Sequence, residues 1–217
     1  MIVRSVNVSL LKQVQHNSKT VATGIFKQPV AGRVVINSFN LAGDQQVDLV
    51  NHGGEHKAVY GFASDHYAFW QQTLTQDELH YGQFGENLTI DGLHENIFCI
   101  GDQLQVGDSI LEITQPRVPC FKLGIAFGRE DMPRLFVENA ATGIYFRVIE
   151  TGSVASGDTV SLHQPHPARL SVQRLFKAYF DKSLTEAEKL AVMQRALEID
   201  ALSVEWREKL ESRLAQS

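Results

Sequence analysis

The hydrophobic pattern of this 217-residue sequence changes its period near residue 167, and that change limits the folds open to the chain. Upstream, short alternating runs such as 2–8 and 109–114 are separated by glycine turns, including Gly-Asp at 107–108 and 157–158. Many short strands with few helices between them favour a largely antiparallel barrel. Downstream, apolar residues recur three and four positions apart, which predicts amphipathic helices. The predicted fold class is therefore mainly β with α, a β-barrel followed by a small three-helix bundle.

Composition places the boundary between the two parts in the segment 163–167. All eight histidines, both cysteines and all six prolines precede residue 168, and the X-Pro pairs in this segment favour an extended linker. We predict a barrel domain over 1–167 and a three-helix unit over 168–217, with a capping box at Thr185–Glu188. Because the second unit lacks histidine and cysteine, we interpret it as a docking or stabilising unit that does not carry the chemistry.

Charge and hydropathy exclude several classes of protein. The net charge of −5 argues against broad nucleic-acid binding, which requires a basic surface. No apolar run approaches the ~20 residues of a membrane span, and no signal peptide is evident, so we expect no membrane partner. Two cysteines do not make a disulfide framework, and we expect a cytoplasmic protein with reduced thiols. The oligomeric state stays open.

Cys120 lies in the segment of greatest chemical interest. Pro116 and Pro119 precede it, and each proline fixes its own φ and biases the residue before it toward an extended conformation. The cysteine should therefore lie on a stiff, non-helical turn at the end of a strand. Arg117 and Lys122 bring positive charge close to the sulfur, which favours the thiolate that attacks electrophiles and binds metals. The alternative is a small apolar side chain in a loop, which is how we interpret the other cysteine, Cys99.

A second candidate segment is the glycine-containing loop at 51–60. Gly53 and Gly54 allow close backbone approach to a ligand, and Lys57 adds a cation, so the loop could cradle an anion. His52 and His56 have a spacing that suits zinc on a helix, but the two glycines disfavour a helix there. A plain tight turn is about as consistent with these residues. Further along, the pair Glu86–Asn87 indicates either a turn or polar groups directed into a pocket.

Four segments follow one another in a fixed order: His52–Tyr60, Phe84–Leu88, Pro116–Leu123 and Thr142–Val148. Together they resemble the motifs of the MOSC family, the domains similar to the C-terminal part of molybdenum cofactor sulfurases. The trailing helices resemble the extension of the YiiM-type bacterial members of that family. One departure is His56, because the family often has an aspartate just before the motif lysine.

The resemblance implies a β-barrel that binds the molybdenum cofactor, molybdopterin, with Cys120 as the metal ligand and catalytic residue. A soft metal carried by a dithiolene accepts a thiolate. The phosphate of the pterin needs cations, and Arg suits bidentate phosphate contact better than Lys. The residues expected to bind the cofactor are Lys57, His52, Gly53, Gly54, Asn87, Arg117, Lys122, Arg147 and Arg33.

The activity implied by the resemblance is reduction of small N-hydroxylated compounds, including the base analogue 6-N-hydroxylaminopurine. This reaction takes two electrons and two protons and releases an amine and water. Since no flavin or iron–sulfur motif is evident, we expect a separate electron-donor protein of the flavin or iron–sulfur class.

Two other functions remain open on the sequence alone. In the first, the protein carries the cofactor or handles sulfur, with a persulfide on Cys120 and no turnover of its own. In the second, Cys120 is the nucleophile of a hydrolase or transferase. We disfavour the second, because no histidine and acid stand out as its partners.

Overall fold

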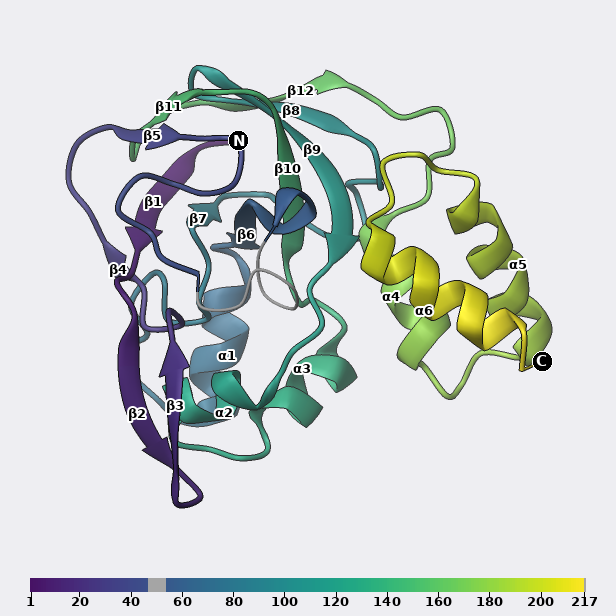
Figure 1. The fold of residues 1–217 in the computed structure, drawn as a ribbon, viewed down its shortest axis with the longest axis horizontal. Helices are drawn as coiled ribbons and strands as arrows, with labels where there is room; N and C mark the ends of the chain where they lie inside the picture. Colours follow the sequence, from purple (N-terminus) through teal and green to yellow (C-terminus); the bar gives the residue numbers. More distant parts are fainter. Residues whose placement is uncertain (47–53, 217) are drawn as a thin grey trace.

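A computed structural model describes residues 1–46 and 54–216 and shows a strand-rich body with three helices at one side (Figure 1). Strands dominate the part before residue 168, as the sequence predicts. The strands are β1 (Val3–Val8), β2 (Lys12–His16), β3 (Lys19–Thr23), β4 (Gln28–Pro29), β5 (Val34–Ile36), β6 (Val59–Ala63), β7 (Leu88–Ile90), β8 (Gln103–Val106), β9 (Ser109–Pro116), β10 (Ile144–Glu150), β11 (Gly152–Val154) and β12 (Val160–Gln164). The helices are η1 (Glu55–Lys57), α1 (His66–Leu74), α2 (Phe121–Phe127), α3 (Met132–Asn139), α4 (Val172–Phe180), α5 (Glu186–Leu197) and α6 (Val204–Leu214).

The main sheet has eight strands in the order β12-β8-β9-β10-β6-β7-β1-β4. Its pairs are antiparallel except for β6 and β7, which run parallel. The two ends of the sheet meet, because Ile2 forms an antiparallel bridge with Thr159 and the Val3 N–H donates to the Asp158 carbonyl at 2.9 Å. This seam between β1 and the segment leading into β12 closes the sheet into a barrel, which confirms the predicted fold class.

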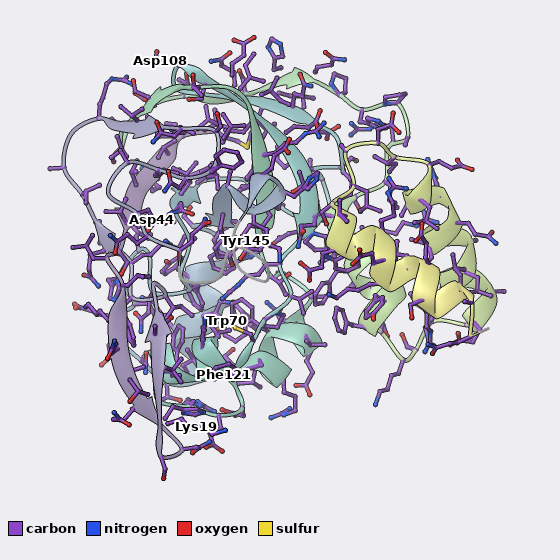
Figure 2. The ribbon with its side chains drawn as sticks, in the orientation of Figure 1. Lys19, Asp44, Trp70, Asp108, Phe121 and Tyr145 are labelled. Carbon is purple, nitrogen blue, oxygen red and sulfur yellow. The ribbon has the colours of Figure 1, made fainter. Side chains whose placement is uncertain are left out.

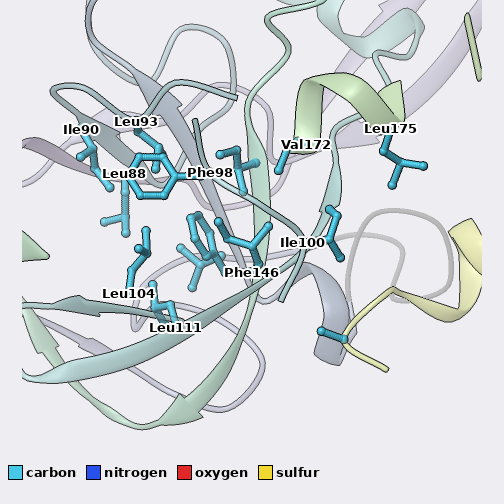
Figure 3. Packing of buried hydrophobic residues seen from close by; sticks show 14 of the residues in the cluster. Leu88, Ile90, Leu93, Phe98, Ile100, Leu104, Leu111, Phe146, Val172 and Leu175 are labelled. Atoms are coloured by element: carbon cyan, nitrogen blue, oxygen red, sulfur yellow. The ribbon is translucent and has the colours of Figure 1, made fainter. Parts of the chain in front are cut away.

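The barrel encloses an apolar core that continues into the C-terminal helices. Leu88, Leu104, Leu111 and Phe146 are fully buried inside it and point toward one another (Figure 3). The same cluster extends to Leu175 of α4 and, beyond it, to α5 and α6. Because one apolar cluster crosses the predicted boundary, the helices are docked on the barrel by burial of apolar surface, which is the main stabilising contribution in folding.

The three C-terminal helices begin where their capping residues predict. Ser171 accepts a hydrogen bond from the Arg174 N–H, and Thr185 forms the predicted capping box with Glu188. Ser203 caps α6 in the same way, and its own backbone N–H donates to the Thr114 carbonyl of β9 at 3.2 Å. The start of α6 is therefore tied directly to a barrel strand.

A second, aromatic core lies between one end of the barrel and helices α1, α2 and α3. Trp70 of α1 stacks on Phe136 of α3 with ring centroids 4.6 Å apart, and both contact Phe84. Such pairs contribute about 0.5–1.5 kcal/mol each beyond the area that they bury. Helix α2 was not predicted from the sequence, and its seven residues follow Cys120 directly. Leu123 and Phe127 of α2 pack into this aromatic core and hold the helix in place.

None of the helices within residues 1–46 and 54–216 combines the length and apolarity that a membrane span needs.

Candidate functional site

Cys120 lies at the junction between a barrel strand and a helix. Strand β9 ends at Pro116, and Cys120 is the N-cap of α2 with an extended backbone at φ −124° and ψ 172°. The stiff turn at a strand end is therefore confirmed, but a helix follows it directly. The thiol is half-buried. Since a helix N-terminus carries partial positive charge, this position favours a thiolate.

The thiol lines a partly open cavity together with several residues from distant parts of the sequence. Of the expected site residues, Lys57, Asn87, Arg117 and Lys122 share this cavity with Cys120. The structure adds Lys27, Tyr60 and Tyr145 to its wall, none of which the sequence singled out. The cavity thus combines one thiol with four cationic side chains.

Arg117 is fully enclosed at the back of the cavity. Its guanidinium lies over the Tyr60 ring at 4.8 Å and donates to the Tyr60 hydroxyl at 3.2 Å. Burial opposes the charge, but Tyr60, Tyr145 and the Cys120 thiol together raise the pKa of Arg117 above its ordinary value. The interaction is reciprocal, so the guanidinium stabilises negative charge on the Cys120 sulfur.

Lys27 and Asp44 form a buried ion pair at the cavity wall. The lysine Nζ lies 2.5 and 2.6 Å from the two carboxylate oxygens of Asp44. Asn87 donates to the second of these oxygens at 2.9 Å and accepts from the Tyr60 N–H at 3.1 Å. Burial lowers the pKa of Lys27, with Asp44 acting against that shift. The only sequence signal for Lys27 was its position as a single lysine directly after the apolar residues 24–26.

Lys57 is almost fully buried and reaches toward the C-terminal helices. Its Nζ forms an ion pair with the carboxylate of Glu205 in α6, and the Lys57 carbonyl accepts from the Gln46 side chain at 3.2 Å. Gly54 precedes η1 with φ +84°, a conformation that favours glycine, as the loop motif predicted. His52 and Gly53 lie outside the described residues.

Among the described residues, Arg33 and Arg147 do not line the cavity, so the structure does not bring these two expected cofactor-binding residues together with Cys120. Arg33 bonds with Asp158 at 2.9 Å and with Asp108 at 3.3 Å. Asp108 lies at the end of the molecule opposite Phe121, with Tyr145 between them (Figure 2). Arg147 pairs with Glu112 at 2.5 Å. Each arginine holds strands of the barrel together.

Two further residues, Cys99 and Glu86, are buried but do not line the cavity. Cys99 is buried, and burial raises the pKa of its thiol, so the interpretation of this cysteine as an apolar core residue is confirmed. Glu86 turns away from the cavity, whereas its neighbour Asn87 faces it. One Glu86 oxygen accepts from the Tyr67 hydroxyl, from the Gly82 N–H at 2.8 Å and from the Thr89 hydroxyl at 2.8 Å.

The sequence profile of the MOSC domain matches residues 48–161, which is more than half of the chain. The chain belongs to the MOSC family. A second profile, the YiiM-like 3-alpha helix domain, matches residues 170–217. The protein is therefore a YiiM-type MOSC member with C-terminal helices.

Relatives of this MOSC protein support that assignment along most of its length. The uncharacterized protein YflK of Bacillus subtilis is 37% identical over 205 residues, which cover 94% of this chain and 90% of YflK. A protein of Gibberella moniliformis named "Reductase" is 34% identical over 73% of this chain, but the match spans only 29% of that longer protein. The crystal structure of YiiM from Geobacillus stearothermophilus has a TM-score of 0.80 at 30% identity, with 97% of both chains covered.

The chemistry of the cavity fits the cofactor associated with MOSC domains. A thiolate at Cys120 suits a soft metal such as molybdenum held by a dithiolene. Lys27, Lys57, Arg117 and Lys122 suit the negative charge of a pterin phosphate. Neutral tyrosine hydroxyls complete the wall, because burial raises the pKa of Tyr60 and Tyr145 and keeps both protonated.

Proposed function

We propose that this protein is a molybdenum-cofactor-dependent reductase of N-hydroxylated compounds, which detoxifies base analogues such as 6-N-hydroxylaminopurine in the cytoplasm. The observation that carries the proposal is the meeting of one half-buried thiol with four cations in a single cavity. The MOSC domain and the "Reductase" relative support the same activity.

One residue of the cavity would bind the metal, and its cationic side chains would bind the negatively charged phosphate of the pterin. Cys120 would bind molybdenum through its thiolate. Arg117 is pre-positioned by Tyr60, so it needs little rearrangement to bind an anion, whereas Lys27 already has Asp44 as its counter-ion. When bound, the cofactor supplies the two-electron chemistry.

The overall reaction balances as R–NHOH plus two electrons and two protons giving R–NH₂ and water. The N–O bond breaks, the nitrogen is reduced, and the oxygen leaves as water. A separate electron-donor protein of the flavin or iron–sulfur class would supply the electrons. Tyr60 and Tyr145 remain protonated and so can donate hydrogen bonds within the cavity, while the Arg117 guanidinium would stabilise negative charge on the Cys120 sulfur.

The test begins with protein produced in a host able to make the cofactor. Molybdenum and pterin are quantified on the purified chain, and reduction of 6-N-hydroxylaminopurine is followed with a chemical reductant in place of the donor protein. Stoichiometric cofactor with turnover supports the reductase. Stoichiometric cofactor without turnover would support the cofactor-carrier or sulfur-handling alternative, and absence of molybdenum would contradict both.

A further inference from the structure

The peptide group between Thr142 and Gly143 lies next to Tyr60, a residue of the cavity wall. Its carbonyl accepts a hydrogen bond from the Tyr60 hydroxyl at 2.8 Å. The same hydroxyl accepts from the Arg117 guanidinium at 3.2 Å. The backbone N–H of Arg117 donates to the Gly143 carbonyl, also at 3.2 Å. Residues 142–143 therefore contact Arg117 through its backbone and, by way of Tyr60, through its side chain.

Gly143 allows this peptide group to approach Tyr60 closely. Its φ is +86°, a conformation that favours glycine. A Cβ at this position would lie 2.4 Å from the Tyr60 ring and 2.7 Å from the hydroxyl oxygen. The position of the 142–143 peptide group thus determines where the Tyr60 hydroxyl can lie.

The N–H of the same peptide group is bound by a buried carboxylate. Glu95, in the loop after β7, is 2% exposed, and one of its oxygens accepts from the Gly143 N–H at 2.6 Å. Its other oxygen lies 2.9 Å from Nε2 of His66, the first residue of α1. The Glu95 carbonyl accepts from the Gln173 N–H of α4 at 2.8 Å. Glu95 is therefore fixed on three sides, although it does not line the cavity.

A continuous row of hydrogen bonds connects the Glu95 carboxylate to the Arg117 guanidinium. It runs from the guanidinium to the Tyr60 hydroxyl, through the 142–143 peptide group, to the carboxylate. The hydroxyl and the peptide group each accept from the arginine side and donate toward the carboxylate. The bonds therefore polarise in one direction and strengthen one another. The carboxylate in this way orients the Tyr60 hydroxyl so that its oxygen faces the guanidinium.

We propose that Glu95 is a positioning residue for Arg117, and that it holds the guanidinium in the cavity through the 142–143 peptide group and Tyr60. Without the carboxylate, the peptide group and the Tyr60 hydroxyl lose their fixed orientation, and the guanidinium samples more than one position. An anion then binds less tightly, because ordering a side chain on binding costs free energy. The effect on the cofactor rests on the proposed function, whereas the position of the guanidinium does not.

The first measurement uses the full-length protein without cofactor, isotopically labelled at arginine. Hydrogen exchange of the Arg117 Nε–H is followed by NMR, and its signal is assigned from its absence in Arg117→Lys. Glu95→Ala should speed this exchange about tenfold, because the side chain opens more often. Glu95→Gln keeps an oxygen for the Gly143 N–H and should speed it less. In a Tyr60→Phe background, where the row is already broken, Glu95→Gln should have no further effect.

The second measurement is the rate at which cofactor-loaded protein releases its pterin. Glu95→Ala should release it about tenfold faster than the unmodified protein, since changes in affinity appear mostly in the dissociation rate. The matched control is Asp102→Ala, which removes an equally buried carboxylate that does not line the cavity. Asp102 also accepts from backbone N–H groups, those of Cys99 at 2.9 Å and His166 at 2.8 Å. Its variant should match the unmodified protein in both measurements.

Three outcomes would overturn the positioning role of Glu95. They are unchanged Arg117 exchange in both Glu95 variants, equally fast exchange in Asp102→Ala, and unchanged pterin release in Glu95→Ala. Faster Arg117 exchange that is specific to the Glu95 variants, with no cofactor bound even by the unmodified protein, would leave the positioning role standing and reject the proposed function. The two failures are therefore distinguishable.

Discussion

Lys57 and Glu205 form an ion pair that joins the cavity lined by Cys120 to the C-terminal helices. Lys57 lines the cavity, and Glu205 lies in the first turn of α6, two residues after the Ser203 backbone contact with β9. The sequence interpretation treated residues 168–217 as a stabilising unit remote from the chemistry. The ion pair shows that this unit fixes one of the cations of the site.

The first prediction is that Lys57 and Glu205 are energetically coupled. Glu205→Gln removes the negative charge from one partner of the buried Lys57 ammonium, so the free energy of unfolding should fall by about 1–3 kcal/mol. Thermal unfolding of both single mutants and the double mutant gives the coupling energy. Lys209→Ala, which removes the partly exposed second partner of Glu205, should cost less, under about 1 kcal/mol. Strictly additive single mutants would contradict the coupling.

The second prediction separates the two cysteines. Cys120→Ser should abolish molybdenum coordination and reductase activity, because serine does not offer a soft thiolate ligand. Cys99→Ser should leave both nearly intact, since Cys99 is buried away from the cavity. Metal analysis and turnover on both variants provide the measurement. Full activity in Cys120→Ser would reject the thiolate ligand.

The third prediction distinguishes the arginines. Arg117→Lys keeps the charge but loses the fork geometry and the ring contact with Tyr60, so cofactor affinity should fall about tenfold to hundredfold. Arg33→Lys makes the same change at the far end of the barrel and should leave cofactor content unchanged. Pterin and molybdenum content per chain is the measurement. Equal loss in both variants would place Arg33 back among the binding residues.

The fourth prediction concerns Trp206, which α6 buries completely in the shared apolar core. Trp206→Ala should lower the free energy of unfolding by about 3–5 kcal/mol, or roughly 6–20 °C in the melting temperature. Cofactor content should fall with it, because the same helix carries Glu205.

A chain cut after residue 167 should expose the barrel face that this core covers and aggregate. A soluble, cofactor-loaded truncation would contradict this dependence.

The fifth prediction follows from Glu86. Burial raises the pKa of its carboxyl group above the ordinary value, so the folded state holds a proton that the unfolded state releases above about pH 4.3. The stability contributed by this group is therefore full below that pH and is lost as the pH rises through the raised pKa.

The measurement for Glu86 is the melting temperature between pH 4 and 9. Glu86→Gln keeps an acceptor for Tyr67, Gly82 and Thr89 without the ionisable proton, so its melting temperature should decline less with rising pH. Glu138→Gln, at an exposed carboxylate, is the control and should follow the unmodified protein. Identical profiles in all three proteins would show that Glu86 does not titrate in this range.

Periodicity and local motifs were sufficient to predict most of the barrel, the C-terminal helices and the turn at Cys120 after a strand end. These features depend on neighbours close in sequence, such as the prolines before Cys120 and the Thr185 capping box. Helix α2 was missed because its seven residues follow two prolines and contain Gly124, and tertiary packing on the aromatic core overrides that weak local signal.

The partners of the cations could not be predicted from the sequence. Arg33, Arg117 and Arg147 look alike as isolated residues, and only the fold separates the one buried on Tyr60 from the two paired with acids on the barrel. Lys27 and Asp44 meet across a turn of the chain whose geometry no local pattern encodes. Long-range pairing of this kind is set by the topology of the sheet.

The seam between β1 and residues 157–160 also constrains how the chain folds as it is made. Asn7 and Val8 at the end of β1 pair with β4, but the start of β1 finds its neighbours in β7 and in this late segment. The start of β1 therefore cannot be paired on both sides until about 160 residues have been synthesised, which at roughly 5–20 residues per second takes on the order of ten to thirty seconds. During that interval the start of β1 has an open edge, and the nascent barrel is most exposed to misassembly at the ribosome.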